Sequence, residues 1–129
     1  MILVTDIHYF ETHATAAGLL FEDWNSKEVH QQYVVTLKNV APYESGQFYK
    51  RELPCILKLL EDIDGAQLEA IIIDGYVTLG VDQRRGLGMY LYRELNAVIP
   101  IIGVAKNEFQ GTPESCKLLR GDSKKPLFV

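Results

Sequence analysis

The sequence predicts an α/β fold in which three antiparallel strands, followed by parallel strands, form one mixed sheet flanked by helices. Three observations predict it. The first 40 residues contain strand-like segments joined by short turns, a helical spacing of apolar residues follows, and continuous apolar runs then alternate with a second helical segment. Short turns favour antiparallel neighbours, whereas an intervening helix favours parallel ones. The length of 129 residues suits one domain, expected over residues 1–129.

The first three strands are expected at residues 2–10, 16–24 and 29–40. The third contains Tyr-Val-Val-Thr-Leu, a run of β-branched and aromatic residues typical of strands. Asn25 and Ser26 supply turn chemistry between the second and third. We therefore expect an antiparallel meander.

A helix is predicted over residues 47–62, because apolar residues there recur three and four positions apart. Pro54 lies inside it and predicts either a displaced first turn or a kink. Residues 68–74 contain a continuous apolar run, typical of a buried parallel strand, which we place beside the first strand. A Gly-rich loop, a helix at residues 89–98, a strand at 99–104 and a short strand at 126–129 complete the order.

Composition excludes several classes of protein. Hydrophobic residues at 47% and charged residues at 23% exclude disordered, collagen-like and coiled-coil chains. The net charge of −4 lacks the basic excess of most nucleic-acid-binding domains. No apolar run approaches the ~20 residues that span a bilayer, and Asp6 interrupts the apolar start, so neither a membrane protein nor a signal peptide is expected. Cys55 and Cys116 are too few for a disulfide framework, which favours the reducing cytoplasm.

Three carboxylates occupy positions where apolar residues are expected. Asp6 shares a strand face with apolar neighbours, Glu52 lies on the apolar stripe of the first predicted helix, and Asp74 ends the most buried strand. Any one of them is more commonly a cap or a half-exposed residue. Together they predict one acidic cluster at a sheet edge, where a hard cation such as Mg²⁺ or Mn²⁺ would offset the repulsion and activate water or stabilise phosphoryl charge.

Four segments resemble the endonuclease V family, in the same order along the chain. Residues 42–52, Pro-Tyr-Glu-Ser-Gly-Gln-Phe-Tyr-Lys-Arg-Glu, are similar to a family segment that runs Pro-Tyr-x-Pro-Gly, four residues, Arg-Glu. Residues 72–75 resemble its apolar strand ending in Asp-Gly, and residues 101–106, Ile-Ile-Gly-Val-Ala-Lys, resemble its Thr-Ile-Gly-Val-Ala-Lys. Residues 4–6, Val-Thr-Asp, stand where the family has Val-Asp after a first strand. The resemblance covers most of residues 1–111.

This resemblance implies a ribonuclease H-like fold and a Mg²⁺-dependent endonuclease that acts on deoxyinosine in DNA or inosine in RNA, as in DNA repair. It implies that Asp6, Glu52 and Asp74 are catalytic metal ligands. Lys106 would lie near the scissile phosphate, a role that its charge suits. Nucleic acid is then the expected partner and Mg²⁺ or Mn²⁺ the expected cofactor.

The resemblance also implies residues that contact the substrate. Tyr43 would belong to a wedge inserted beside the lesion, where an aromatic ring can stack on an unpaired base. The loop at residues 75–88 would help to form the pocket for the extruded base, with Gly75, Arg84 and Arg85 as expected nucleic-acid contacts.

The sequence also departs from the family pattern. The family loop Asp-Gly-x-Gly-x-Ala-His-Pro-Arg is replaced by residues 74–85, which lack His-Pro, and Ser45 replaces the second proline of the wedge. A final family helix, with a further His or Asp of the metal site, has no counterpart in the sequence. We therefore keep two alternatives: a catalytically impaired relative that acts as a nucleic-acid or protein-binding module, and an unrelated ribonuclease H-like domain. Without that final helix one face of the sheet would stay partly uncovered and expose apolar area, so we expect a homo-oligomer.

Overall fold

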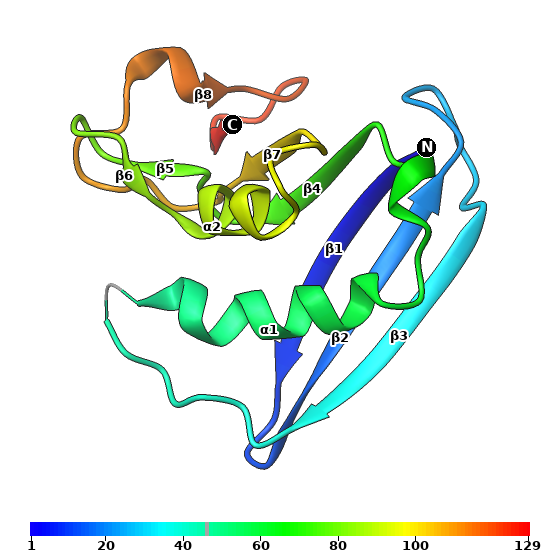
Figure 1. Ribbon diagram of the computed structural model, residues 1–129. Coiled ribbons are helices and arrows are strands. Elements are labelled where there is room, and N and C mark those ends of the chain that lie inside the picture. Colours follow the sequence, from blue (N-terminus) through cyan, green and yellow to red (C-terminus); the bar gives the residue numbers. More distant parts are fainter. Residues whose placement is uncertain (46) are drawn as a thin grey trace.

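A five-stranded mixed sheet organises the computed structural model, which describes residues 1–45 and 47–129 (Figure 1). The order β3-β2-β1-β4-β7 is antiparallel from β3 to β1 and parallel from β1 to β7. This confirms the predicted mixed sheet and the place of the apolar strand beside the first one. The strands are β1 (Ile2–Tyr9), β2 (His13–Phe21), β3 (Gln31–Lys38), β4 (Ala70–Asp74) and β7 (Ile101–Val104).

The second strand begins and ends three residues earlier than predicted, at His13 and Phe21 instead of residues 16 and 24. The backbone N–H of Phe10 donates to the His13 carbonyl over 2.8 Å, which closes a tight hairpin immediately after β1. The prediction was wrong here because this turn contains neither Gly nor Pro, the residues that usually mark one.

Two helices cover the same face of the sheet, α1 (Phe48–Leu60) and α2 (Leu87–Glu94) (Figure 1). Helix α1 continues through Pro54. Helix α2 ends well before the predicted residue 98, because Asn96 and Ala97 adopt positive φ angles of 58° and 57°, which a right-handed helix cannot include. Helix and sheet side chains share one core, whose central members are Leu3, Ala16, Leu20, Ile56, Leu59, Ile71, Ile73, Leu87 and Leu91.

Short elements occupy the two long connections. The loop after β4 contains a small hairpin, β5 (Thr78–Leu79) with β6 (Arg84–Arg85), which the sequence did not predict. Strand β8 (Lys117–Leu118) pairs with β9 (Leu127–Phe128), which lies within the predicted terminal strand. The 3₁₀ turns are η1 (Gly65–Gln67) and η2 (Glu114–Cys116). Within the described residues, no helix combines the length and apolar character needed to cross a membrane.

Candidate functional site

The three predicted carboxylates lie where β1 and β4 cease to pair. Pairing between these parallel strands ends at Val4 and Ile72, where the Thr5 hydroxyl donates to the Ile72 carbonyl over 3.2 Å. Asp6 and Asp74 each follow the last pair by two residues, so they occupy corresponding positions on adjacent strands. Helix α1 places Glu52 beside them. All three line one small cavity of about 10 Å³, roughly the volume of a single water-sized sphere.

Glu52 is the buried member of this group, with 8% of its surface exposed. Its pKa is raised from 4.5 to about 7. Burial is the main cause, and the negative charges of Asp74 and Asp6 add to it, whereas the neighbouring Tyr9 hydroxyl and Arg51 guanidinium favour the charged form. A buried carboxylate whose charge is this unfavourable is a group that a bound cation would stabilise.

Tyr9 and Arg51 are neighbours of Glu52, and neither was predicted from the sequence to be a site residue. The Arg51 Cζ lies 3.6 Å from the centroid of the Tyr9 ring. The Tyr9 hydroxyl and the Arg51 Nε are buried without a hydrogen-bond partner among the described residues. Burial, and then the charge of Glu52, raise the pKa of Tyr9, which therefore keeps its proton to donate. The only sequence signals were the alternation that puts Tyr9 on the helix-covered face and the adjacency of Arg51 to Glu52.

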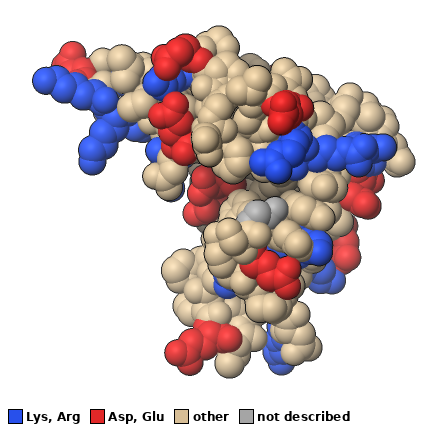
Figure 2. Space-filling view, turned by 90° about the vertical axis from the view of Figure 1, so that its left-hand side faces the viewer, with Lys and Arg blue, Asp and Glu red and all other residues tan. Residues whose placement is uncertain are grey.

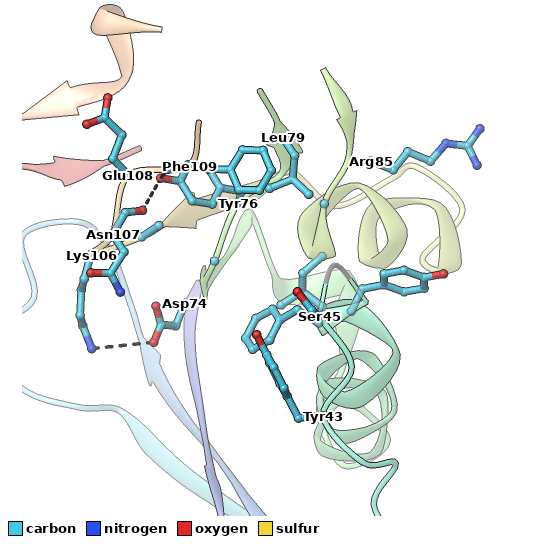
Figure 3. Close-up of a pocket in the computed structure, with 16 residues that line it drawn as sticks. Tyr43, Ser45, Asp74, Tyr76, Leu79, Arg85, Lys106, Asn107, Glu108 and Phe109 are labelled. Atoms are coloured by element: carbon cyan, nitrogen blue, oxygen red, sulfur yellow. Dashed lines mark hydrogen bonds and ion pairs between the residues drawn. The ribbon is translucent and has the colours of Figure 1, made fainter. Parts of the chain in front are cut away.

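Lys106 stands at the same sheet edge. It follows β7, which runs parallel to β4. The carboxyl ends of the two strands therefore lie at the same edge of the sheet, and Lys106 lies near Asp74. Its Nζ lies 3.8 Å from an Asp74 Oδ2, with 78% of the Lys106 side chain and 51% of the Asp74 side chain exposed (Figure 3). An exposed ion pair of this length is weak, which leaves the ammonium available to an incoming anion.

The donors suit a hard cation, although the three carboxylates do not lie close enough together to hold one. Within residues 1–45 and 47–129, no three His, Cys, Asp or Glu side chains form a group that could hold a metal ion. Three carboxylates nevertheless border one cavity, and the most buried of them carries an unfavourable charge. Oxygen ligands of this kind match Mg²⁺ and Mn²⁺, and binding would require the carboxylates to move closer together.

A larger pocket of about 630 Å³ opens beside Asp74 and Lys106 (Figure 3). It lies between the loop that follows β4, the start of α1 and the segment that follows β7. Its walls are rich in aromatic rings, which suit a flat ligand that stacks. The aromatic lining residues are Tyr43, Phe48, Tyr49, Tyr76 and Phe109.

Tyr76 ties two walls of this aromatic pocket together. Its hydroxyl donates to the Asn107 carbonyl over 2.5 Å and accepts from the Phe109 N–H over 3.0 Å (Figure 3). The loop also packs tightly on its surroundings, since a Cβ at Gly86 would lie 2.6 Å from the Tyr76 carbonyl and a Cβ at Gly103 would collide with the Gly75 carbonyl. The pocket wall is therefore fixed by contacts between distant parts of the chain.

The expected nucleic-acid contacts are only partly gathered in this pocket. Tyr43 lines it with 65% of its surface exposed, and Gly75 lines it at the end of β4. Arg85 lines it too, but its guanidinium points away from Asp74 (Figure 3). Arg84 is exposed and does not line it. Gly46 of the wedge motif lies outside the described residues.

Charge around this region is mixed. Basic and acidic side chains are interspersed over the face in Figure 2, without one dominant sign. This agrees with the net charge of −4. Any nucleic acid would therefore be recognised by local contacts more than by a broad positive field.

Comparison with known proteins identifies relatives of one kind. The family model described as Endonuclease V matches residues 1–128. Endonuclease V of Ignicoccus hospitalis is 30% identical over 100 residues, which cover 78% of this chain and 45% of that protein. Endonuclease V of Azotobacter vinelandii is 30% identical over 108 residues, covering 84% and 47%. The chain thus spans about half the length of these curated relatives.

Solved structures of the same kind share the fold. Ciona intestinalis endonuclease V, in complex with a 24mer DNA containing an inosine followed by a ribo-adenosine, superposes with a TM-score of 0.73 at 17% identity. The match covers 98% of this chain and 68% of that one. The Bacillus subtilis protein also gives a TM-score of 0.73, at 20% identity over 98% of this chain and 62% of its own. These likenesses establish the ribonuclease H-like fold.

Proposed function

Since this chain belongs to the endonuclease V family, we propose that it is a metal-dependent endonuclease that hydrolyses a phosphodiester bond in inosine-containing DNA or RNA. The observation that carries the proposal is the convergence of Asp6, Glu52 and Asp74 on one cavity, with Lys106 at the same sheet edge. Three acidic side chains at the end of a parallel sheet are a poor choice for stability, because their charges repel and one is buried. A catalytic role accounts for them.

In this proposal Asp6, Glu52 and Asp74 hold Mg²⁺ or Mn²⁺. When bound, such an ion supplies Lewis-acid stabilisation of the charge that develops on the phosphate oxygens. Lys106 exchanges its weak contact with Asp74 for a phosphate oxygen and so positions the strand. Tyr9 and Arg51 both favour the charged form of Glu52 and so keep its carboxylate available to the metal ion.

The aromatic pocket would receive the base. Its volume of about 630 Å³ falls within the range of ordinary ligand pockets, and its rings match the flat faces of a purine. Asp74 and Lys106 line it as well, so a base in the pocket keeps its own strand next to the carboxylates. The Ciona intestinalis relative was solved with inosine-containing DNA, which supports the substrate class.

A second candidate function is binding without cleavage. One observation favours it: the carboxylates in the described residues are not grouped to hold a metal ion. A module of this kind would use the aromatic pocket for an inosine base and would leave the strand intact.

Cleavage of end-labelled oligonucleotides separates the two candidates. The substrates are matched DNA and RNA strands with and without one inosine, incubated with Mg²⁺, Mn²⁺ or EDTA. We expect nicking near the inosine that requires the metal and falls by about 100-fold or more in Asp74→Asn. Asp62→Asn is the matched control, because Asp62 is an exposed carboxylate two residues beyond the end of α1.

Two outcomes would contradict the proposal. If wild type binds the inosine strand but does not cleave it with either metal, the binding module is the correct function. If Asp74→Asn cleaves as fast as Asp62→Asn, any nuclease activity arises elsewhere.

A further inference from the structure

The hairpin between β1 and β2 carries an aromatic stack that the proposed catalytic site does not use. The rings of Phe10 and His13 stack with centroids 4.5 Å apart and an angle of 14° between their planes. His8 meets Phe10 edge-on at 4.7 Å. Phe10 still exposes 49% of its surface. The Nδ1 of His13 lies 3.1 Å from the Thr12 hydroxyl, so the imidazole is held in orientation.

This stack lies on the same face of the sheet as Asp6. Side chains alternate along a strand, so Asp6, His8 and Phe10 point to the side that α1 and α2 do not cover, and all three are exposed. The hairpin projects beyond α1 (Figure 1). Phe10 lies four positions after Asp6, which corresponds to about 13 Å along an extended strand. A stacked strand of nucleic acid spans that distance in about four nucleotides, and an extended one in fewer.

A cation and a groove flank the stack. Lys38 is the register partner of His13 on β3, so the two residues lie side by side on this face. Lys38 is exposed and forms no ion pair within the described part of the chain. A groove of about 420 Å³ runs between them, lined by Thr12, His13, Thr36, Lys38 and Asn39. Rings for a base, with an available ammonium at their side, form the usual combination that binds a single strand.

We propose that Phe10, His13 and Lys38, here called the hairpin platform, bind one unpaired nucleotide of the substrate strand within about four nucleotides of the cleavage site. The base extends the Phe10–His13 stack and its phosphate contacts Lys38. This inference rests on the proposed function for the identity of the strand. It adds a binding site outside the aromatic pocket and predicts that affinity depends on strand length.

The test is binding in EDTA, measured by fluorescence anisotropy with two labelled single-stranded DNA oligonucleotides. Both carry a central inosine. The short one reaches only the sheet edge that carries Asp6 and Asp74 beside Glu52, here called the carboxylate edge. The long one is long enough in both directions to extend past the hairpin. We expect Phe10→Ala and His13→Ala to weaken binding of the long oligonucleotide by about 5-fold or more and to leave binding of the short one unchanged. Lys38→Ala should weaken it as well and reduce the salt dependence of binding.

Conservative variants distinguish stacking from hairpin packing. Phe10→Tyr keeps an aromatic ring and should bind like wild type, whereas Phe10→Leu keeps apolar bulk and should lose as much affinity as Phe10→Ala. Trp24→Ala is the matched control, since Trp24 is another exposed aromatic residue, with 58% of its surface accessible, at the opposite end of β2.

The proposal is overturned if Phe10→Leu or Phe10→Ala binds the long oligonucleotide as tightly as wild type. It is also overturned if sedimentation shows that Phe10→Ala abolishes self-association without changing oligonucleotide binding, because the platform would then join two copies of the chain. If the wild type cleaves the inosine strand but the platform substitutions leave binding unchanged, the platform proposal is wrong and the proposed nuclease function stands. If the platform substitutions weaken binding but the wild type does not cleave, the proposed nuclease function is wrong and the platform proposal stands.

Discussion

The carboxylate edge and the aromatic pocket share Asp74 but are built in different ways. The edge takes each carboxylate from a regular element: Asp6 from β1, Glu52 from α1 and Asp74 from β4. The pocket is walled mainly by the loops that follow β4 and β7, which Tyr76 holds together. Regular elements fix positions through local periodicity, whereas loops depend on contacts between distant residues. The positions of the three carboxylates are therefore better determined by local sequence than the shape of the aromatic pocket.

Substitution of Lys106, where the two regions meet, is expected to have a large effect on cleavage. Lys106→Ala should lower the cleavage rate by about 100-fold, because the variant loses the cation that the proposed function places at the phosphate. Single-turnover kinetics on an inosine oligonucleotide measure it. Lys124→Ala removes an exposed lysine outside the site and should cleave at the wild-type rate. Equal rates in the two variants would separate Lys106 from the chemistry.

Glu52 should make the carboxylate edge sensitive to pH. Its pKa is about 7 in the folded protein and near 4.5 in the unfolded chain, so the folded state retains a proton that the unfolded state has lost between these values. The free energy of unfolding should therefore fall as pH rises from 4.5 to 7, by at most about 3 kcal/mol, and stay level above it.

Urea denaturation in EDTA measures this dependence, and Glu52→Gln should flatten it, because the amide carries no charge at any pH. Adding Mg²⁺ at pH 8 should restore stability to wild type and not to Glu52→Gln. A wild-type curve that matches the Glu52→Gln curve across this pH range would show that Glu52 is not held in an unfavourable charged state.

The smallest effect is expected in the aromatic pocket. Tyr76→Phe removes the hydroxyl that bonds to Asn107 and Phe109 and should destabilise the protein by about 1–2 kcal/mol. Preference for inosine over unmodified strands should fall while the rate on a saturating substrate stays close to wild type. Competition cleavage measures that preference, with Tyr33→Phe as the control. A loss of rate equal to that of Lys106→Ala would mean that the two regions are not separable.

Much of the fold follows from the sequence, because apolar runs and alternation determine strands directly. The run at residues 70–74 was placed correctly beside the first strand on this basis. The turn after β1 was predicted to end three residues too late, since it lacks Gly and Pro. The β5–β6 hairpin was not predicted, because its strands are only two residues each. Such elements depend on tertiary contacts more than on local propensity.

The site divides in the same way. Asp6, Glu52 and Asp74 stood out because each is a charge in an apolar pattern, and the structure brings them to one cavity. Tyr9 and Tyr76 did not, because a tyrosine in a strand or loop is unremarkable until its neighbours are known. The roles of the carboxylates, the metal and the expected homo-oligomer stay predictions.

The proposed function depends first on whether the three carboxylates bind a metal ion. Titration of Mn²⁺ followed by electron paramagnetic resonance reports binding whether or not the strand is cut. Asp6→Asn, Glu52→Gln and Asp74→Asn should each weaken Mn²⁺ binding by about 10-fold or more, while Asp62→Asn should not. Wild-type Mn²⁺ affinity in all three carboxylate variants would contradict the proposed function.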